Sequence, residues 1–163
     1  MRKRLLSSNK KSIFNYFLTI CFICLLGIGS VWGETYQFGT IPTGWSASGG
    51  TQSINNIAWT YSSSSYIGLT SNKIQIGSKN NPQTSTWTIS TPIGSFGSNI
   101  KITAIRIQAY TTATTATYDI SVGGTSVKSG SLATSSTDYN AENLSATSGN
   151  IVISMKGSSS SKA

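Results

Sequence analysis

Three polar side chains that can bind a sugar alternate with apolar ones in the middle of the chain: Arg106, Gln108 and Tyr110. In a β-strand this alternation places the polar set on one face and the apolar set on the other. Asp119 lies in a second alternating stretch, residues 116–122. An aromatic ring stacks on a sugar face, and planar polar groups bond to its hydroxyls, when a rigid scaffold holds both. We therefore predict a glycan-binding face that gathers these four residues. The alternative is an ordinary solvated sheet face with an Arg106–Asp119 surface ion pair.

A second candidate glycan site lies in two loops that carry Trp45 and Tyr66. Both rings are large enough to stack on a sugar, and loops of a β-sandwich often carry binding residues. The alternative for Trp45 is a plug that closes one end of the sandwich. Trp59 and Trp87 alternate in phase with isoleucines, so we predict that these two rings belong to the core.

One group of oxygen-bearing side chains, Asp138, Asn140 and Glu142, has ligand types that suit calcium. The three residues alternate, so they share one strand face or one loop. We interpret them as solvated polar residues at the end of a strand. A structural calcium site is the alternative, and we predict no other metal or cofactor.

Groups that perform catalysis are scarce in this chain. There is no histidine, which excludes Ser-His nucleophiles and histidine-bound metals. The cysteines, Cys21 and Cys24, both lie in the first 33 residues. After residue 33 the acids are Glu34, Asp119, Asp138 and Glu142, and their spacing gives no sign of the two facing carboxylates that a glycosidase needs. We therefore predict that the protein is not an enzyme.

The element that must position the first site is a hairpin over residues 100–122, with a loop at 111–115. The apolar phase changes between Ile102 and Ile105, so we expect a one-residue bulge near residues 104–105 to return the later isoleucines to the core. Each buried isoleucine contributes about 1.5–3 kcal/mol, which favours the bulge. The alternative is a strand buried on both faces as far as residue 104. The register that keeps all apolar groups on one side pairs Ile105 with Val122, Ile107 with Ile120 and Ala109 with Tyr118.

The remaining elements are predicted to be short strands separated by turns rich in Gly, Ser and Asn. Residues 46–53 are expected to form a loop. Gly123-Gly124 is expected to form a two-residue hairpin turn that places Val122 opposite Thr125 and Ile120 opposite Val127. The other predicted strands span residues 34–38, 57–61, 66–70, 73–77, 84–90, 139–144 and 151–155.

The first 33 residues read as a signal segment, in which basic residues precede an apolar run over residues 13–31. The alternative is an uncleaved anchor, because the run nearly reaches the length of about 20 residues that spans a bilayer. Removal of this segment leaves residues 34–163, with seven Lys and Arg against four acids, a net charge of +3. These cations are scattered, so we predict no binding to nucleic acid. Membrane contact is expected only through an uncleaved signal segment.

Five stretches carry a resemblance to a known family: IPTGWSASGG, YIGLTSNKIQIGS, IKITAIRIQAY, ATYDISVGGTSV and DYNAENLSATSGNIVISMKGSSSSKA. Their order resembles galactose-binding-like jelly-roll β-sandwich modules of secreted, Bacteroidetes-type surface proteins. The resemblance covers residues 36–163 and is one of pattern, without a diagnostic binding motif.

The resemblance implies an all-β, antiparallel jelly-roll sandwich that follows the signal helix. It also implies that the last strand of the module is missing after residue 163. The expected function is an exported, non-catalytic binding module at the periplasm, the cell surface or outside the cell, with a glycan as partner. The alternatives are a structural or adhesive module that binds a cell-surface protein through an unpaired sheet edge, and a truncated fragment without independent function.

Overall fold

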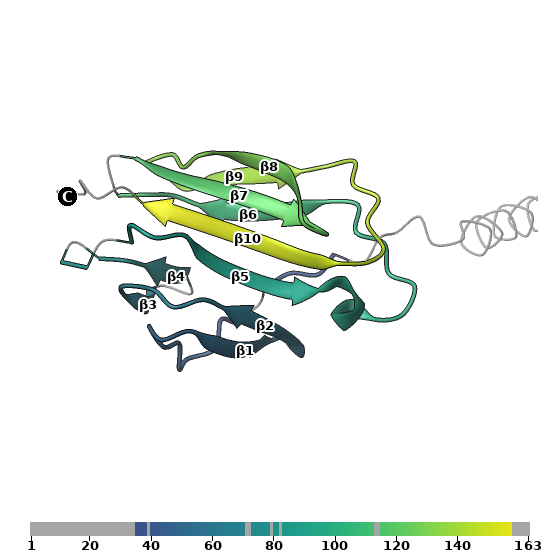
Figure 1. Ribbon diagram of the computed structural model, residues 1–163, viewed down its shortest axis with the longest axis horizontal. Helices are drawn as coiled ribbons and strands as arrows, with labels where there is room; N and C mark the ends of the chain where they lie inside the picture. The colour runs from purple at the N-terminus through teal and green to yellow at the C-terminus, as the bar shows by residue number, and fades with distance from the viewer. Residues whose placement is uncertain are drawn as a thin grey trace, which may run out of the picture. The chain divides into compact units, whose positions relative to one another are not determined.

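The computed structural model describes residues 35–38, 40–70, 73–78, 80–81, 83–112 and 115–157. The predicted signal segment lies outside the described residues. The described residues from Gln37 onward belong to one compact unit, and every contact reported below lies within it. Apart from one short 3₁₀ helix, the regular structure of the described residues is all antiparallel β (Figure 1). The elements are β1 (Gly50–Ile54), β2 (Ile57–Tyr61), β3 (Ile67–Thr70), β4 (Lys73–Ile76), β5 (Trp87–Pro92), η1 (Ile93–Phe96), β6 (Ile105–Ala109), β7 (Ala116–Val122), β8 (Thr125–Ser131), β9 (Thr137–Ala141) and β10 (Asn150–Gly157).

Six strands form the main sheet in the order β1-β2-β5-β10-β7-β8. In Figure 1 the yellow strand β10 runs between β5 and β7. Strict alternation gives this sheet one apolar face, because successive side chains of a strand point to opposite sides. The opposite face carries mostly hydroxyl groups, for example in the cross-strand row Thr51, Thr60 and Ser90. The buried apolar residues of the sheet are Ile54, Ile57, Trp59, Tyr61, Trp87, Ile89, Ala116, Tyr118, Ile120, Val122, Ile151 and Ile153.

A second layer covers the apolar face and consists of two separate strand pairs, β3–β4 and β6–β9. Ile67, Ile76 and Ile107 from these pairs pack against the main core cluster. Tyr139 of β9 meets Tyr118 of β7 with ring centroids 4.3 Å apart. The result is a β-sandwich-like fold, as predicted, and Trp59 and Trp87 are core residues, 4% and 2% exposed.

Two tight turns set the local register of the main sheet. Gly123-Gly124 links β7 to β8 with positive φ at both residues, and Val122 lies opposite Thr125 as predicted. A bulge then shifts the register, so Ile120 lies opposite Lys128 rather than Val127. The β1–β2 turn is also two residues long and has left-handed asparagines at 55 and 56. Residues 50–54 are therefore a strand, and the predicted loop over 46–53 is wrong in that part.

The predicted 100–122 hairpin is also wrong. β6 pairs with β9, with Ile107 opposite Tyr139, whereas β7 pairs with β8 and β10, with Ile120 opposite Ile153. The predicted register used apolar alternation alone, and β9 and β10 satisfy the same alternation equally well.

The predicted change of phase near residue 104 is real, although it is not a bulge within a strand. Thr103 and Ala104 are both exposed, Ile102 forms only an isolated bridge to Ala146, and β6 begins at Ile105.

Several predicted strand limits also differ from the structure. Residues 35–38 are not a strand, the predicted strand 84–90 lies at 87–92, and the predicted strand 139–144 lies at 137–141. None of the described residues forms a helix long and apolar enough to cross a membrane.

Candidate functional site

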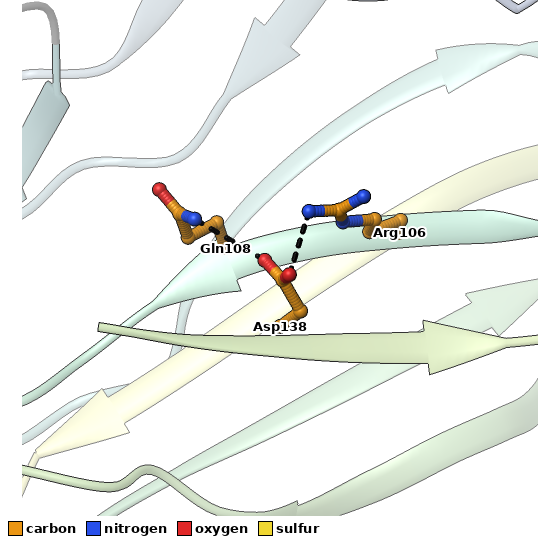
Figure 2. A network of polar contacts seen from close by, with 3 residues as sticks. All are labelled: Arg106, Gln108 and Asp138. Carbon is orange, nitrogen blue, oxygen red and sulfur yellow. Dashed lines mark hydrogen bonds and ion pairs between the residues drawn. The ribbon is translucent and has the colours of Figure 1, made fainter. Parts of the chain in front are cut away.

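The outer face of the β6–β9 pair carries a polar network that joins the two strands (Figure 2). Arg106 Nη2 lies 2.6 Å from Asp138 Oδ2, and Gln108 Nε2 donates to Asp138 Oδ1 at 3.2 Å. Gln108 stands directly opposite Asp138, and Arg106 stands opposite Asn140. Directly opposite residues of an antiparallel pair share a face, so the four side chains lie on one side of the strand pair. This face is called the β6–β9 polar face below.

The polar groups of this face are open to a ligand. The side chain of Arg106 is 66% exposed and that of Asp138 is 38% exposed. Arg106 has five N–H donors, and the contact with Asp138 uses a single nitrogen of the guanidinium group. An exposed ion pair of this kind contributes little to stability, typically about 0.2–1 kcal/mol. The face therefore has hydrogen-bonding capacity beyond what the fold requires.

Tyr110 follows β6 in the same alternating phase and extends the polar face with an aromatic ring. It is 46% exposed, the largest exposed fraction among the described large apolar side chains that reach the surface. Lys73 Nζ of β4 lies 5.3 Å from the centroid of this ring, within the range of a cation–π contact. This contact links the end of β6 to β4 of the other strand pair.

Asp119 does not belong to this site, which corrects the sequence prediction. Its neighbours Tyr118 and Ile120 point into the core, so Asp119 points to the opposite, outer face of the main sheet. There it accepts a hydrogen bond from Ser126 Oγ. The expected Arg106–Asp119 ion pair is therefore wrong, and Asp138 is the acid that meets Arg106.

The second predicted site, which joined Trp45 and Tyr66, does not form a shared platform among the described contacts. Trp45 is partly buried, packs on Tyr61 with ring centroids 4.5 Å apart, and donates from Nε1 to Pro42 O at 2.8 Å. It therefore closes the end of the sandwich, which was the alternative for this residue. Tyr66 is 38% exposed, and its ring lies over Gly68, where an added Cβ would be 2.7 Å from the Tyr66 hydroxyl.

The residues predicted as an alternative calcium site are divided by the structure. Asp138 and Asn140 lie on the β6–β9 polar face, whereas Glu142 follows the end of β9. Both carboxylate oxygens of Asp138 already accept hydrogen bonds. Within the described residues, no three His, Cys, Asp or Glu side chains lie close enough to hold a metal ion.

Sequence reasoning missed the roles of Asp138, Asn140 and Lys73 at this site. The signal for the first two is present in β9, where Thr137, Tyr139 and Ala141 point inward and the residues between them are exposed. No local pattern links β9 to β6, because about thirty residues separate the bonded side chains, as in the pair Arg106 and Asp138.

No family model, no curated protein and no solved structure matches this chain. The resemblance to galactose-binding-like modules therefore stays a prediction. The functional argument depends on the geometry of the β6–β9 polar face.

Proposed function

We propose that this chain is an exported, non-catalytic module of jelly-roll type that binds glycans through the β6–β9 polar face. The observation that carries the proposal is the exposed network of Arg106, Gln108 and Asp138 beside the exposed ring of Tyr110. Export is proposed from the basic and apolar pattern of residues 1–33. The jelly-roll connectivity is proposed from the resemblance described above.

The chemistry of the face suits sugar hydroxyls. Guanidinium, carboxylate and amide groups are planar and offer pairs of donors or acceptors, which match neighbouring hydroxyls on a sugar ring. Asn140, exposed and directly opposite Arg106, adds a further amide to the same surface. Strand pairing holds these groups at fixed separations, so little conformational freedom is lost when a ligand binds.

The shape of the face suggests the kind of glycan. The groups follow two short strands on an open strand surface, with an aromatic ring at one end. Such a surface contacts several units of an extended polysaccharide in succession and encloses none of them. We therefore propose weak binding to an extended chain, with each unit contributing a small part of the affinity.

Affinity electrophoresis of the purified protein in gels that contain soluble polysaccharides tests this proposal. We expect retardation by at least one polysaccharide, and its loss in the variants Tyr110→Ala and Asp138→Asn. Asp119→Asn is the matched control, because it makes the same chemical change on the other side of the sandwich and should leave retardation unchanged.

The proposal fails if the folded wild-type protein is not retarded by any polysaccharide in a broad panel. It also fails if Asp119→Asn and Asp138→Asn reduce retardation equally, because binding would then not depend on the β6–β9 polar face. Circular dichroism of each variant confirms that it is folded.

A further inference from the structure

Strand β8 is one border of the six-stranded sheet, and among the described residues its one partner strand is β7 (Figure 1). In an antiparallel pair, successive residues point their main-chain groups alternately toward and away from the partner. The hydrogen bond from Leu132 N to Ala116 O shows that the main-chain groups of Leu132, just after β8, point toward β7. Residues two and four positions earlier point the same way. Gly130 and Lys128 therefore point their main-chain groups at β7, and Ser129 and Ser131 point theirs away from it.

None of the described strands pairs with the outward side of β8. Among the described residues, no hydrogen bond from the main chain of Ser129 or Ser131 is found on that side. Every side chain of β8 is exposed except that of Val127, which is partly buried. Native edge strands are commonly blocked by proline, by several charges or by a bulge along the edge. β8 has no proline and one charge, and its bulge lies near the turn, so residues 128–131 keep a regular ladder.

We propose that two copies of this chain pair through β8, antiparallel, about a two-fold axis at Ser129. Their main sheets then form one continuous sheet. In this register Lys128 faces the partner subunit's Gly130, so the two lysines do not oppose each other across the interface. A register centred on Ser131 requires residues 132–135 to continue as a strand, and none of them does.

The surface around Gly130 is complementary to a lysine. A Cβ added to Gly130 would lie 3.4 Å from Cε1 and 3.5 Å from the hydroxyl of Tyr118, so this ring lies against the glycine. Lys128 and Gly130 oppose Ile120 and Tyr118 respectively, and therefore share the side of β8 that faces the second layer. Tyr118 is only 5% exposed, so a lysine placed directly opposite Gly130 approaches its ring across the bare Cα of the glycine, and a cation near an aromatic ring is attracted to it. Each subunit supplies both groups, as a two-fold interface requires.

Disulfide trapping tests the register directly. In a full-length background with Cys21→Ser and Cys24→Ser, Ser129→Cys places two thiols opposite each other at the two-fold axis. The expected Cα separation is about 5.5 Å for such a pair, within the range of about 4.4–6.8 Å that a disulfide bridges. Ser131→Cys is the matched control, because the two copies of this residue are four strand positions apart, roughly 13 Å.

We expect a covalent dimer of Ser129→Cys under mild oxidation on non-reducing gels, and none of Ser131→Cys. Light scattering should give twice the monomer mass for the wild-type chain and the monomer mass for Ser129→Pro, which removes an outward N–H group without breaking the ladder to β7. A wild-type protein that stays monomeric at its highest soluble concentration overturns the proposal. Equal cross-linking of the two cysteine variants also overturns it, because random collision would then explain the dimer.

Discussion

The substitution Gly149→Ala tests the contact between the turn that precedes β10 and the β7–β8 turn. Gly149 precedes β10 and has φ +92°, a left-handed conformation that alanine adopts only at a cost. An added Cβ would lie 2.7 Å from Cα of Gly123, which belongs to the β7–β8 turn. That turn is fixed in place because Gly123 N donates to Asn150 O at 2.9 Å. The neighbouring backbone therefore has little freedom to move away from the new methyl group.

The expected loss of stability has two parts. The left-handed conformation costs a non-glycine residue about 1–2 kcal/mol. Overpacking against fixed backbone adds about 1–3 kcal/mol. Gly124→Ala is the matched control, since Gly124 has φ +84° and nothing within 4 Å of an added Cβ. This control should therefore show the first cost alone.

Urea denaturation followed by circular dichroism measures both variants. We expect Gly149→Ala to lower the free energy of unfolding by about 2–5 kcal/mol and Gly124→Ala by about 1–2 kcal/mol. For a domain of this size the difference of about 1–3 kcal/mol between the two variants corresponds to a melting temperature roughly 3–15 °C lower for Gly149→Ala than for Gly124→Ala. Equal losses in the two variants would refute the contact between the turn that precedes β10 and the β7–β8 turn.

Three further predictions concern the core, the tyrosine pair and the polar face. Ile120 is fully buried, at 0% exposed, so Ile120→Ala should lower the unfolding free energy by about 2–5 kcal/mol in urea, and a loss below about 1 kcal/mol would contradict its central position. Burial, with Tyr139 as a second cause, raises the pKa of Tyr118 above its ordinary value of 10.0. As the pH rises, the Tyr118 hydroxyl therefore loses its proton in the unfolded chain before it does so in the folded one. The stability of the fold is retained below pH 10 and falls above it. Tyr118→Phe should make the urea midpoint of unfolding less dependent on pH above pH 10. A double-mutant cycle should give a coupling of about 0.2–1 kcal/mol for Arg106 with Asp138 and none for Arg106 with Asp119.

The sequence predicts the local part of this fold well because turn chemistry is local. Gly123-Gly124 has positive φ at both residues, the condition for a two-residue turn of this hand, and the predicted pair Val122–Thr125 forms. The same chemistry is present between β1 and β2. Asparagine is the residue other than glycine that most readily adopts positive φ, and residues 55 and 56 are both asparagine. An Asn-Asn pair before the strand 57–61 is typical of a two-residue hairpin turn, and such a turn predicts β1 as the preceding strand.

Long-range pairing could not be derived from the same patterns. Tyr118, Ile120 and Val122 need a partner strand whose apolar side chains point in the same direction. β6 offers such a strand, and so does β10, which is the observed partner. Pairing β7 with β6 or with β10 buries similar apolar side chains, so the buried apolar area alone does not distinguish the two partners. What separates them is the arrangement of all strands together, since β6 is bound to β9 in the second layer.

The candidate site was predicted in part, and the reason follows from strand geometry. Arg106, Gln108 and Tyr110 share a face because alternation along one strand requires it, whatever the partner is. The acid that joins them depends on the partner. The predicted partner of β6 was β7, which carries Asp119, and the observed partner is β9, which carries Asp138. Asp119 therefore lies on the other side of the sandwich.

The six-stranded sheet supplies most of the core, whereas the candidate site lies on the second layer. Variants of the site can therefore be tested with little effect on folding. Apart from Ile93 and Ala141, every buried apolar residue in the described part of the chain lies on the six-stranded sheet. The outer side chains of β6 and β9 thus contribute little to the core, and Asp138→Asn should cost less than about 1 kcal/mol of stability. A binding defect in that variant would then report the site itself. The β8 edge lies in the other layer, so Ser129→Pro and Asp138→Asn should act on separate surfaces. We expect Ser129→Pro to make the protein monomeric while each monomer still binds glycan, and Asp138→Asn to abolish glycan retardation while the protein stays dimeric. Complete loss of retardation in folded Ser129→Pro, or a monomeric mass for folded Asp138→Asn, would instead mean that the glycan-binding surface and the dimer interface overlap.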